Sequence, residues 1–198
     1  MASPPASVAA LVTRLTNQTP EPRVFGGVTV LELADYPAAG QTTFVTDGLA
    51  AHDRSVFRGK PTGFELVLTT RVLRDVLCER LADAVRDDLA AAERGDAHAR
   101  VATLPPRGIM YNGAFACDAA PHLVFSTDLS LAPALTERHR CCDRQVELLP
   151  VVPITDEELE DYDILPRSLI ARLRTREDLD DITGRLGRKR RPLTQRTQ

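Results

Sequence analysis

The sequence lacks the segments that would place a protein in a membrane or send it out of the cell. None of its apolar runs approaches the roughly 20 residues that span a bilayer. The first residues, Met1-Ala-Ser-Pro-Pro5, have neither the cationic flank nor the apolar core of a secretory signal. Four cysteines in 198 residues, with no Cys-x-x-Cys pair, indicate no disulfide framework. We therefore expect a cytoplasmic protein that does not bind membranes.

The motifs that mark enzymes are also missing from the sequence. Gly26-Gly27 precedes an expected strand, whereas a phosphate-binding glycine loop follows a strand and opens a helix. The run His139-Arg140-Cys141-Cys142 is the only His/Cys cluster, and adjacent cysteines wrap poorly around a tetrahedral zinc ion, so we predict a loop with incidental thiols. Cys117 and His122 have no neighbour in sequence that would activate a thiol. We predict no catalytic residue, no metal and no cofactor; a thiol- or metal-dependent enzyme using residues 139–142 stays the minor alternative.

Charge is distributed unevenly along the chain. Six of the 25 basic side chains and none of the 28 acidic ones lie from Arg185 to Gln198, which leaves 19 basic against 28 acidic elsewhere, a balance of −9. Such a body repels nucleic acid and attracts basic protein surfaces. The basic tail, which contains glycine and proline but no apolar period, is expected to be disordered. Without interleaved aromatics it would bind nucleic acid only weakly.

Hydrophobic periodicity predicts alternating helical and extended segments. An apolar stripe at Val8, Leu11, Val12 and Leu15 predicts a helix that Ser3 caps, with Pro4 at its first position. In the expected strand 63–69, Phe64, Leu66 and Leu68 alternate with the other side chains, so one face should be dry. The other expected elements are strands at 28–33, 41–46, 121–126 and 145–154, a long amphipathic helix from about 70 to 93, and a helix at 167–174. Strand 145–154 is the most apolar and should be central, but its two prolines require an edge or a bulge.

The sharpest local signal follows this last strand. Thr155 and Glu158 form a capping box, with Ile154 and Leu159 at the hydrophobic-staple positions. The helix start continues into six carboxylates within eight residues, which lack the ligand order and glycine of a calcium loop. They fit a solvated helix start, and the same face could bind a basic partner. The candidate partner-binding residues are Asp156, Glu157, Glu160, Asp161 and Asp163.

These elements predict a single α+β domain. We expect a mixed, mostly antiparallel sheet packed against the long amphipathic helix and shorter terminal helices. Residues 1–22 would form an N-terminal helix and linker within the domain, residues 23–176 its main part, and residues 177–198 a C-terminal segment with the basic tail.

The order of several segments resembles the Suppressor of fused (SUFU-like) domain family. Gln41-Thr-Thr-Phe-Val-Thr-Asp-Gly-Leu49 is similar to that family's aromatic–valine–threonine, glycine–leucine segment, although Asp47 interrupts it. Gly63-Phe-Glu-Leu-Val-Leu68 resembles its glutamate–leucine strand, and Pro121-His-Leu-Val-Phe125 the strand ahead of its terminal motif. The corner Leu148-Leu-Pro-Val-Val-Pro-Ile-Thr-Asp-Glu-Glu158 carries the most specific similarity, but the glycine expected beyond it is missing at 162–165.

The resemblance implies a binding module and no enzyme. The animal member of the family sequesters a transcription factor by capturing a peptide, partly through strand pairing, and many bacterial relatives look like immunity proteins that neutralise a toxin domain. The chain is rich in alanine and arginine and has only two lysines, which suits a compact bacterial member of the family. We expect its acidic surface to bind a basic toxin domain. A regulatory or scaffold protein of the same fold with an endogenous partner is the main alternative.

Overall fold

The computed structural model describes residues 4–52, 56–57, 60–71, 81–82, 86, 110–111, 122–125, 131–136, 138–141 and 144–154. The helical elements with defined bounds are α1 (Val8–Thr16), α2 (Leu49–His52) and the 3-10 turn η2 (Pro133–Leu135). The strands are β1 (Glu21–Phe25), β2 (Val28–Ala34), β3 (Thr42–Asp47), β4 (Val56–Phe57), β5 (Lys60–Thr70), β6 (Met110–Tyr111), β7 (His122–Phe125), β8 (Arg138–Cys141) and β9 (Arg144–Ile154).

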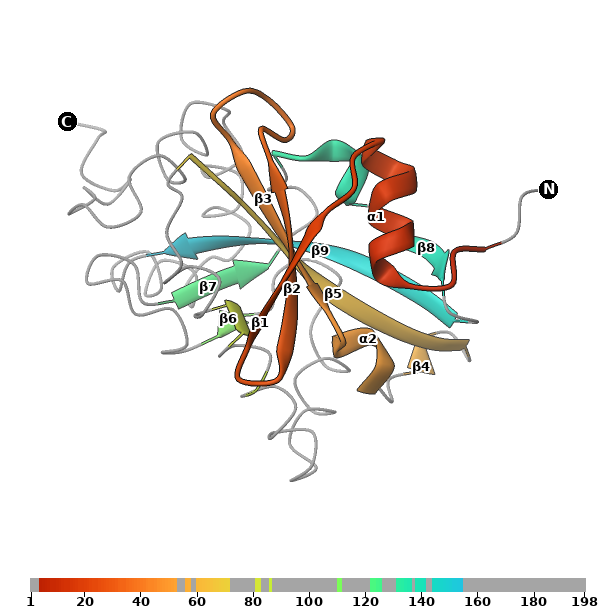
Figure 1. The fold of residues 1–198 in the computed structure, drawn as a ribbon. Helices are drawn as coiled ribbons and strands as arrows, with labels where there is room; N and C mark the ends of the chain where they lie inside the picture. The colour runs from red at the N-terminus through yellow and green to blue at the C-terminus, as the bar shows by residue number, and fades with distance from the viewer. Residues whose placement is uncertain are drawn as a thin grey trace.

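The strands form one mixed sheet in the order β1-β2-β3-β5-β9-β7-β6, with β4 beside β5 and β8 beside β9 (Figure 1). Within the described ranges, every pairing is antiparallel except that of β5 with β9. Parallel neighbours need a crossover connection, and the chain between β5 and β9 is long enough to provide one. The prediction of a mixed, mostly antiparallel sheet is confirmed.

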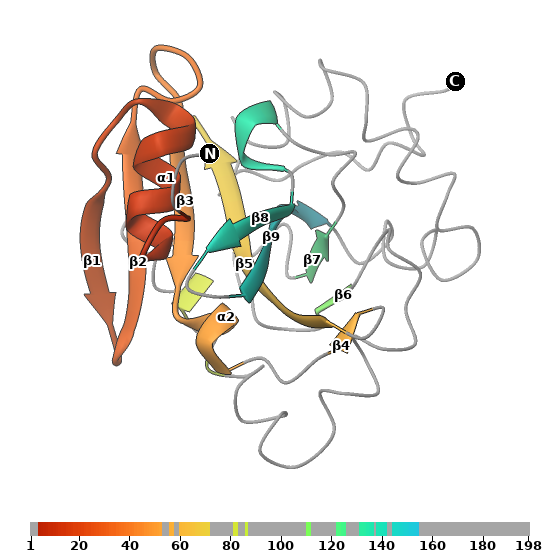
Figure 2. The ribbon, with the colours of Figure 1, turned by 90° about the vertical axis from the view of Figure 1, so that its right-hand side faces the viewer.

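Helix α1 lies against one face of this sheet, as the two perpendicular views agree (Figures 1 and 2). Its apolar stripe is confirmed, because Val8, Leu11 and Val12 are buried. They belong to a core cluster with side chains of the sheet and η2: Leu31, Leu33, Val45, Val67, Leu135, Cys141, Val146 and Leu148. No helix in the described part of the chain combines the length and apolarity needed to cross a membrane.

The predicted start of α1 is wrong by four residues. Ser7, and not Ser3, is the N-cap, and its hydroxyl oxygen accepts the backbone N–H of Ala10 at 3.1 Å. Pro4 cannot serve as the first helical residue because it precedes Pro5, and a residue before proline is displaced from the helical region. At the other end, Asn17 closes the helix in the left-handed conformation, with a φ of 58°.

Strand β1 was not predicted, and the sequence does contain a signal for it. Gly26 and Gly27 have φ values of 55° and 85°, and Phe25 and Val28 are paired directly across them. Two central residues with positive φ are the signature of a two-residue hairpin turn that glycine tolerates best. Pro22 is accommodated because β1 is the first strand in the sheet order, where an edge strand can spare a ladder donor.

Strand β5 is buried on both faces, so the expectation of a single dry face is wrong. Val67 contributes to the core cluster beneath α1, while Leu66 and Leu68, which alternate with it, are also fully buried. Glu65 has 0% of its surface exposed and Thr69 6%, although polar side chains at alternate positions are typical of a wet face. The burial of Glu65 is the feature from which the candidate site is built.

Strand β9 has the central position that its apolar sequence predicts. It pairs with β5 over Gln145–Pro150, with β8 over Arg144–Glu147 on its other side, and with β7 over Val151–Ile154. Among the described strands, Pro150 pairs only with Val67 of β5 and Pro153 only with Leu123 of β7. Each proline therefore needs to pair with one neighbouring strand only, and its missing backbone N–H can be accommodated within an apolar central strand.

The long amphipathic helix predicted from about 70 to 93 lies mainly outside the described residues. Leu81, Ala82 and Arg86 are helical, and the first two have no exposed surface. The guanidinium of Arg86 donates to the carbonyl oxygen of Phe25 at 3.0 Å, which brings this segment against the β1–β2 turn. The capping box at 155–158, the acidic residues 156–163, the helix at 167–174 and the basic tail lie outside the described residues altogether.

Candidate functional site

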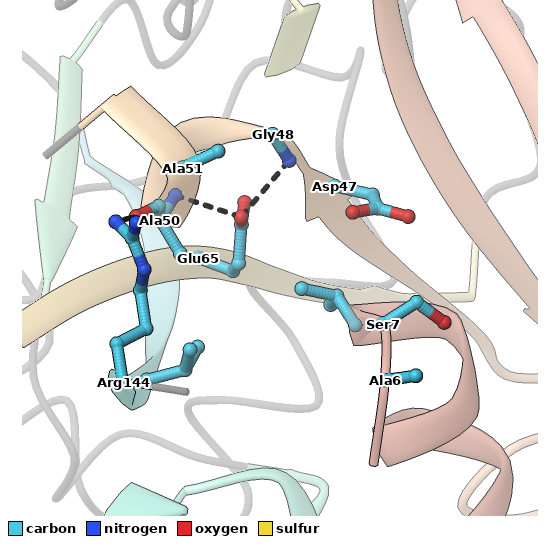
Figure 3. Close-up of a pocket in the computed structure, with 10 residues that line it drawn as sticks. Ala6, Ser7, Asp47, Gly48, Ala50, Ala51, Glu65 and Arg144 are labelled. Carbon is cyan, nitrogen blue, oxygen red and sulfur yellow. Dashed lines mark hydrogen bonds between the residues drawn. The ribbon is translucent and has the colours of Figure 1, made fainter. Parts of the chain in front are cut away.

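The side chain of Glu65, on β5, holds together the segment where β3 ends and α2 begins. Its Oε2 atom accepts the hydroxyl of Thr46 at 2.5 Å. Its Oε1 atom accepts the backbone N–H groups of Gly48 and Ala50, each at 2.9 Å (Figure 3). Thr46 in turn accepts the backbone N–H of Leu66 at 2.8 Å. A buried carboxyl is tolerated only when its oxygens accept hydrogen bonds. Here three donors come from the short segment Thr46–Ala50, which runs from the end of β3 into α2.

Gly63 allows α2 to approach β5 closely enough for these bonds to form. A Cβ atom at this position would lie 2.7 Å from the Cα and the carbonyl oxygen of Ala50. Because these are backbone atoms, no side-chain rotation could relieve the contact. The sequence Gly63-Phe-Glu65 therefore combines a residue that admits the α2 backbone with a residue that binds it.

Burial raises the pKa of Glu65 to about 7, in spite of the hydrogen bonds from Thr46, Ala50 and Gly48, which lower it. The neighbouring charge of Asp47 raises the same pKa further. Burial also raises the pKa of Asp47 above its ordinary value. Two nearby carboxyl groups thus hold their protons more firmly than they would in water, because burial removes the water that would stabilise their charged forms.

These groups border a pocket of about 210 Å³ between α1, α2, the end of β3, the middle of β5 and the start of β9. Figure 3 shows Glu65 between Asp47 on one side and Arg144 on the other. The guanidinium of Arg144 donates to the carbonyl oxygen of Ala50, so this cation is bound to the α2 backbone. The residues that line the pocket are Ala6, Ser7, Val8, Asp47, Gly48, Ala50, Ala51, Glu65, Arg144 and Val146.

The pocket can be compared with only some of the candidates predicted from sequence, because most of them fall beyond the described ranges. Asp156, Glu157, Glu160, Asp161 and Asp163 lie outside the described residues, as do Cys117 and Cys142. The predicted loop at 139–142 is wrong for its first three residues, because His139, Arg140 and Cys141 belong to β8, paired with β9. Cys141 is buried and packs in the core cluster. Among the described residues, no group of three or more His, Cys, Asp or Glu side chains could hold a metal ion.

Sequence reasoning assigned Glu65 to a strand face and missed its role. The signal was a single acidic residue inside the otherwise apolar run Phe64-Glu-Leu-Val-Leu68. A charged residue in such a run needs either solvent or buried partners. The partners come from Thr46 to Ala50, a segment that sequence spacing alone does not place next to β5.

Comparison with known proteins gives a match at the level of structure. No family model and no curated protein sequence matches the chain. A structure titled "the Sufu-Fu complex crystal structure" superposes with a TM-score of 0.64 at 13% identity, covering 98% of this chain and 94% of the other. The chain has the Suppressor of fused fold. Drosophila Suppressor of Fused superposes with a TM-score of 0.57 at 15% identity over 94% of this chain, which spans 51% of that longer protein.

The match agrees with the resemblance seen in the sequence. Two of the segments that carry the resemblance, Gln41–Leu49 and Gly63–Leu68, contact one another in the structure through Glu65. A third begins in the second half of β9, where Leu148–Pro150 pair in parallel with β5. The segments similar to the SUFU-like domain are therefore neighbours in the sheet, and the first two of them supply residues that line the pocket.

Proposed function

We propose that this SUFU-like chain is a non-enzymatic protein-binding module of the immunity type, which binds and neutralises a basic toxin domain. The observation that supports a binding role is the fold itself, since one matching structure is a complex between Sufu and the protein Fu. The chain spans about half the length of Drosophila Suppressor of Fused. Binding a toxin over its basic surface requires shape and charge complementarity and no chemistry in the module itself.

The proposed contact surface is the acidic segment Asp156, Glu157, Glu160, Asp161 and Asp163. Its charge adds to the balance of −9 outside the basic tail, so a basic partner would be attracted from a distance. Electrostatic attraction of this kind accelerates association, and it weakens as salt screens the charges. The proposal therefore makes partner capture depend on ionic strength.

The test is affinity capture from the native lysate, followed by measured binding of the captured protein at several salt concentrations. Reversing Glu157, Glu160 and Asp161 to lysine should slow association and reduce its salt dependence. Glu21→Lys, a charge reversal at an exposed position of β1 outside the acidic segment, is the control and should change association far less. Unchanged capture and salt dependence in the triple variant would show that the contact surface is assigned wrongly.

The basic tail supports a second candidate, a regulatory or scaffold protein with an endogenous partner. Six cations without an acid, from Arg185 to Gln198, could contribute a contact that an acidic immunity surface does not need. Deleting residues 185–198 separates the two proposals. Loss of capture on deletion favours the regulatory role, whereas retained capture of a basic toxin domain favours the immunity role.

A further inference from the structure

The pocket beside Glu65 has the size and lining of a site for one side chain. Its volume of about 210 Å³ is below the roughly 300 Å³ at which pockets for drug-sized ligands begin. Part of its wall is apolar, formed by alanine and valine side chains of α1, α2 and β9. The remainder is polar or charged. A pocket with these two kinds of wall suits a side chain that has an apolar stem and a charged head.

The charges at the pocket favour a cationic head. Asp47 of β3 and Glu65 of β5 are its acidic residues, and Arg144 of β9 is its basic residue. Arg144 is already bound to the carbonyl oxygen of Ala50, on the side of Glu65 away from Asp47 in Figure 3. The lining residues from α1 and α2 carry no charge. The Asp47 side of the pocket is thus left with carboxyl groups and no cation from the residues that line it.

We propose that this pocket takes one lysine or arginine side chain of the protein partner, with its aliphatic stem along the alanine and valine wall and its charged head at Asp47. Lysine and arginine routinely bury their methylene stems against apolar surface in this way. The inference rests on the proposed binding function and deepens it, because it names the residue type through which a basic partner would be anchored. An anionic head, by contrast, would be repelled by Asp47. The cation available to it would be the guanidinium of Arg144, which already donates to the carbonyl oxygen of Ala50.

The same geometry couples binding to a proton. Burial raises the pKa of both Asp47 and Glu65, and Arg144 is the described cation that faces Glu65 from the packed elements. A second cation in the pocket would favour both ionised carboxylates and so lower both pKa values. Binding should therefore release protons near neutral pH, where Glu65 is about half protonated, and it should strengthen as the pH rises from 6 to 8.

The inference is tested with small probes on the isolated chain. n-Butylguanidinium should shift the backbone amide resonances of Gly48, Ala50 and Ala51 saturably and lower the pKa of Glu65, read from its carboxyl carbon. Butyrate and n-butanol, which share the stem but not the cation, should do neither. Asp47→Asn should weaken the guanidinium effect by about tenfold, the worth of one partly buried charge contact. Glu21→Gln, on exposed β1, should leave it unchanged.

Several outcomes would overturn the inference. One such outcome is an equal shift of the amide resonances with n-butanol, and another is a stronger shift with butyrate. An unchanged response of the Asp47→Asn variant to n-butylguanidinium would also contradict the inference, provided that the spectrum of the variant shows the native fold. With a captured partner in hand, failure of Asp47→Asn to weaken binding would overturn this inference while leaving the proposed function intact. Failure of the wild-type chain to capture any protein would overturn the proposed function, and the probe titration would still decide the pocket.

Discussion

The carboxylate of Glu65 accepts the backbone N–H of Ala50 at 2.9 Å, across fifteen residues of chain. This bond and its companion from Gly48 attach the first residues after β3 to the middle of β5. Because Glu65 has no exposed surface, the bonds form in a setting where an unsatisfied carboxyl would be costly. One side chain thus fixes the position of α2, and with it one wall of the pocket.

The first prediction concerns stability and pH. The pKa of Glu65 is about 7 in the folded chain against an ordinary 4.5, so its folded form prefers the proton. The corresponding stability is fully present below about pH 4.5 and is lost as the pH rises through 7. This difference in pKa corresponds to about 3 kcal/mol of unfolding free energy over that interval.

The Glu65→Gln variant measures this term, because its amide does not titrate and its oxygen can still accept from Gly48 and Ala50. We expect urea unfolding between pH 4 and pH 8 to show the wild type losing about 3 kcal/mol relative to the variant. Glu21→Gln, at an exposed position, should leave the wild-type pH profile unchanged. Parallel pH profiles for the wild type and Glu65→Gln would contradict the assignment of this pKa to Glu65.

The second prediction concerns the close approach at Gly63. A Cβ atom there would lie 2.7 Å from backbone atoms of Ala50, so Gly63→Ala must push α2 away from β5. We expect a loss of unfolding free energy of about 1 to 3 kcal/mol, the usual cost of overpacking. The displacement should also weaken the bonds that Glu65 accepts, and so shift the resonances of the Gly48 and Ala50 amides.

A double-mutant cycle distinguishes this backbone clash from a side-chain one. The Cβ of Ala50 is also close, at 2.8 Å, but the nearest atoms belong to its backbone. Ala50→Gly should therefore fail to rescue Gly63→Ala, and the two effects on unfolding free energy should be additive within about 0.5 kcal/mol. Substantial rescue would mean that the side chain of Ala50, and not the α2 backbone, limits the approach.

The periodic apolar segments of this fold could be predicted from sequence, and the contacts between them could not. Val8, Leu11 and Val12 predicted the buried stripe of α1, and the β-branched runs predicted β2, β3, β5 and β9 to within a few residues. Each of these signals is local, since burial of one face follows from spacing along one segment. The strand β1 was not predicted, although the glycine pair that follows it is a hairpin signal.

The site escaped prediction for the opposite reason. Glu65 is buried because donors from Thr46, Gly48 and Ala50 reach it across a gap in sequence, and no periodicity reports such a contact. The family resemblance includes both segments, Gln41–Leu49 and Gly63–Leu68, but it does not indicate that they are in contact. The acidic residues from 156 to 163 form a cluster that is visible in the sequence itself, whereas Glu65 is a single carboxyl within an apolar strand.

The third prediction concerns the start of α1, where sequence and structure disagree. Ser7 caps the helix through the N–H of Ala10, so Ser7→Ala should lower the unfolding free energy by about 1 kcal/mol. Ser3→Ala is the matched control, because Ser3 is the cap that the sequence alone suggested, and we expect it to change stability far less. Ser7 also lines the pocket, so restoring the cap with Ser7→Asp should recover stability while adding a carboxylate there. Equal losses from Ser3→Ala and Ser7→Ala, measured by urea unfolding at pH 7, would place the start of the helix nearer the sequence-based position.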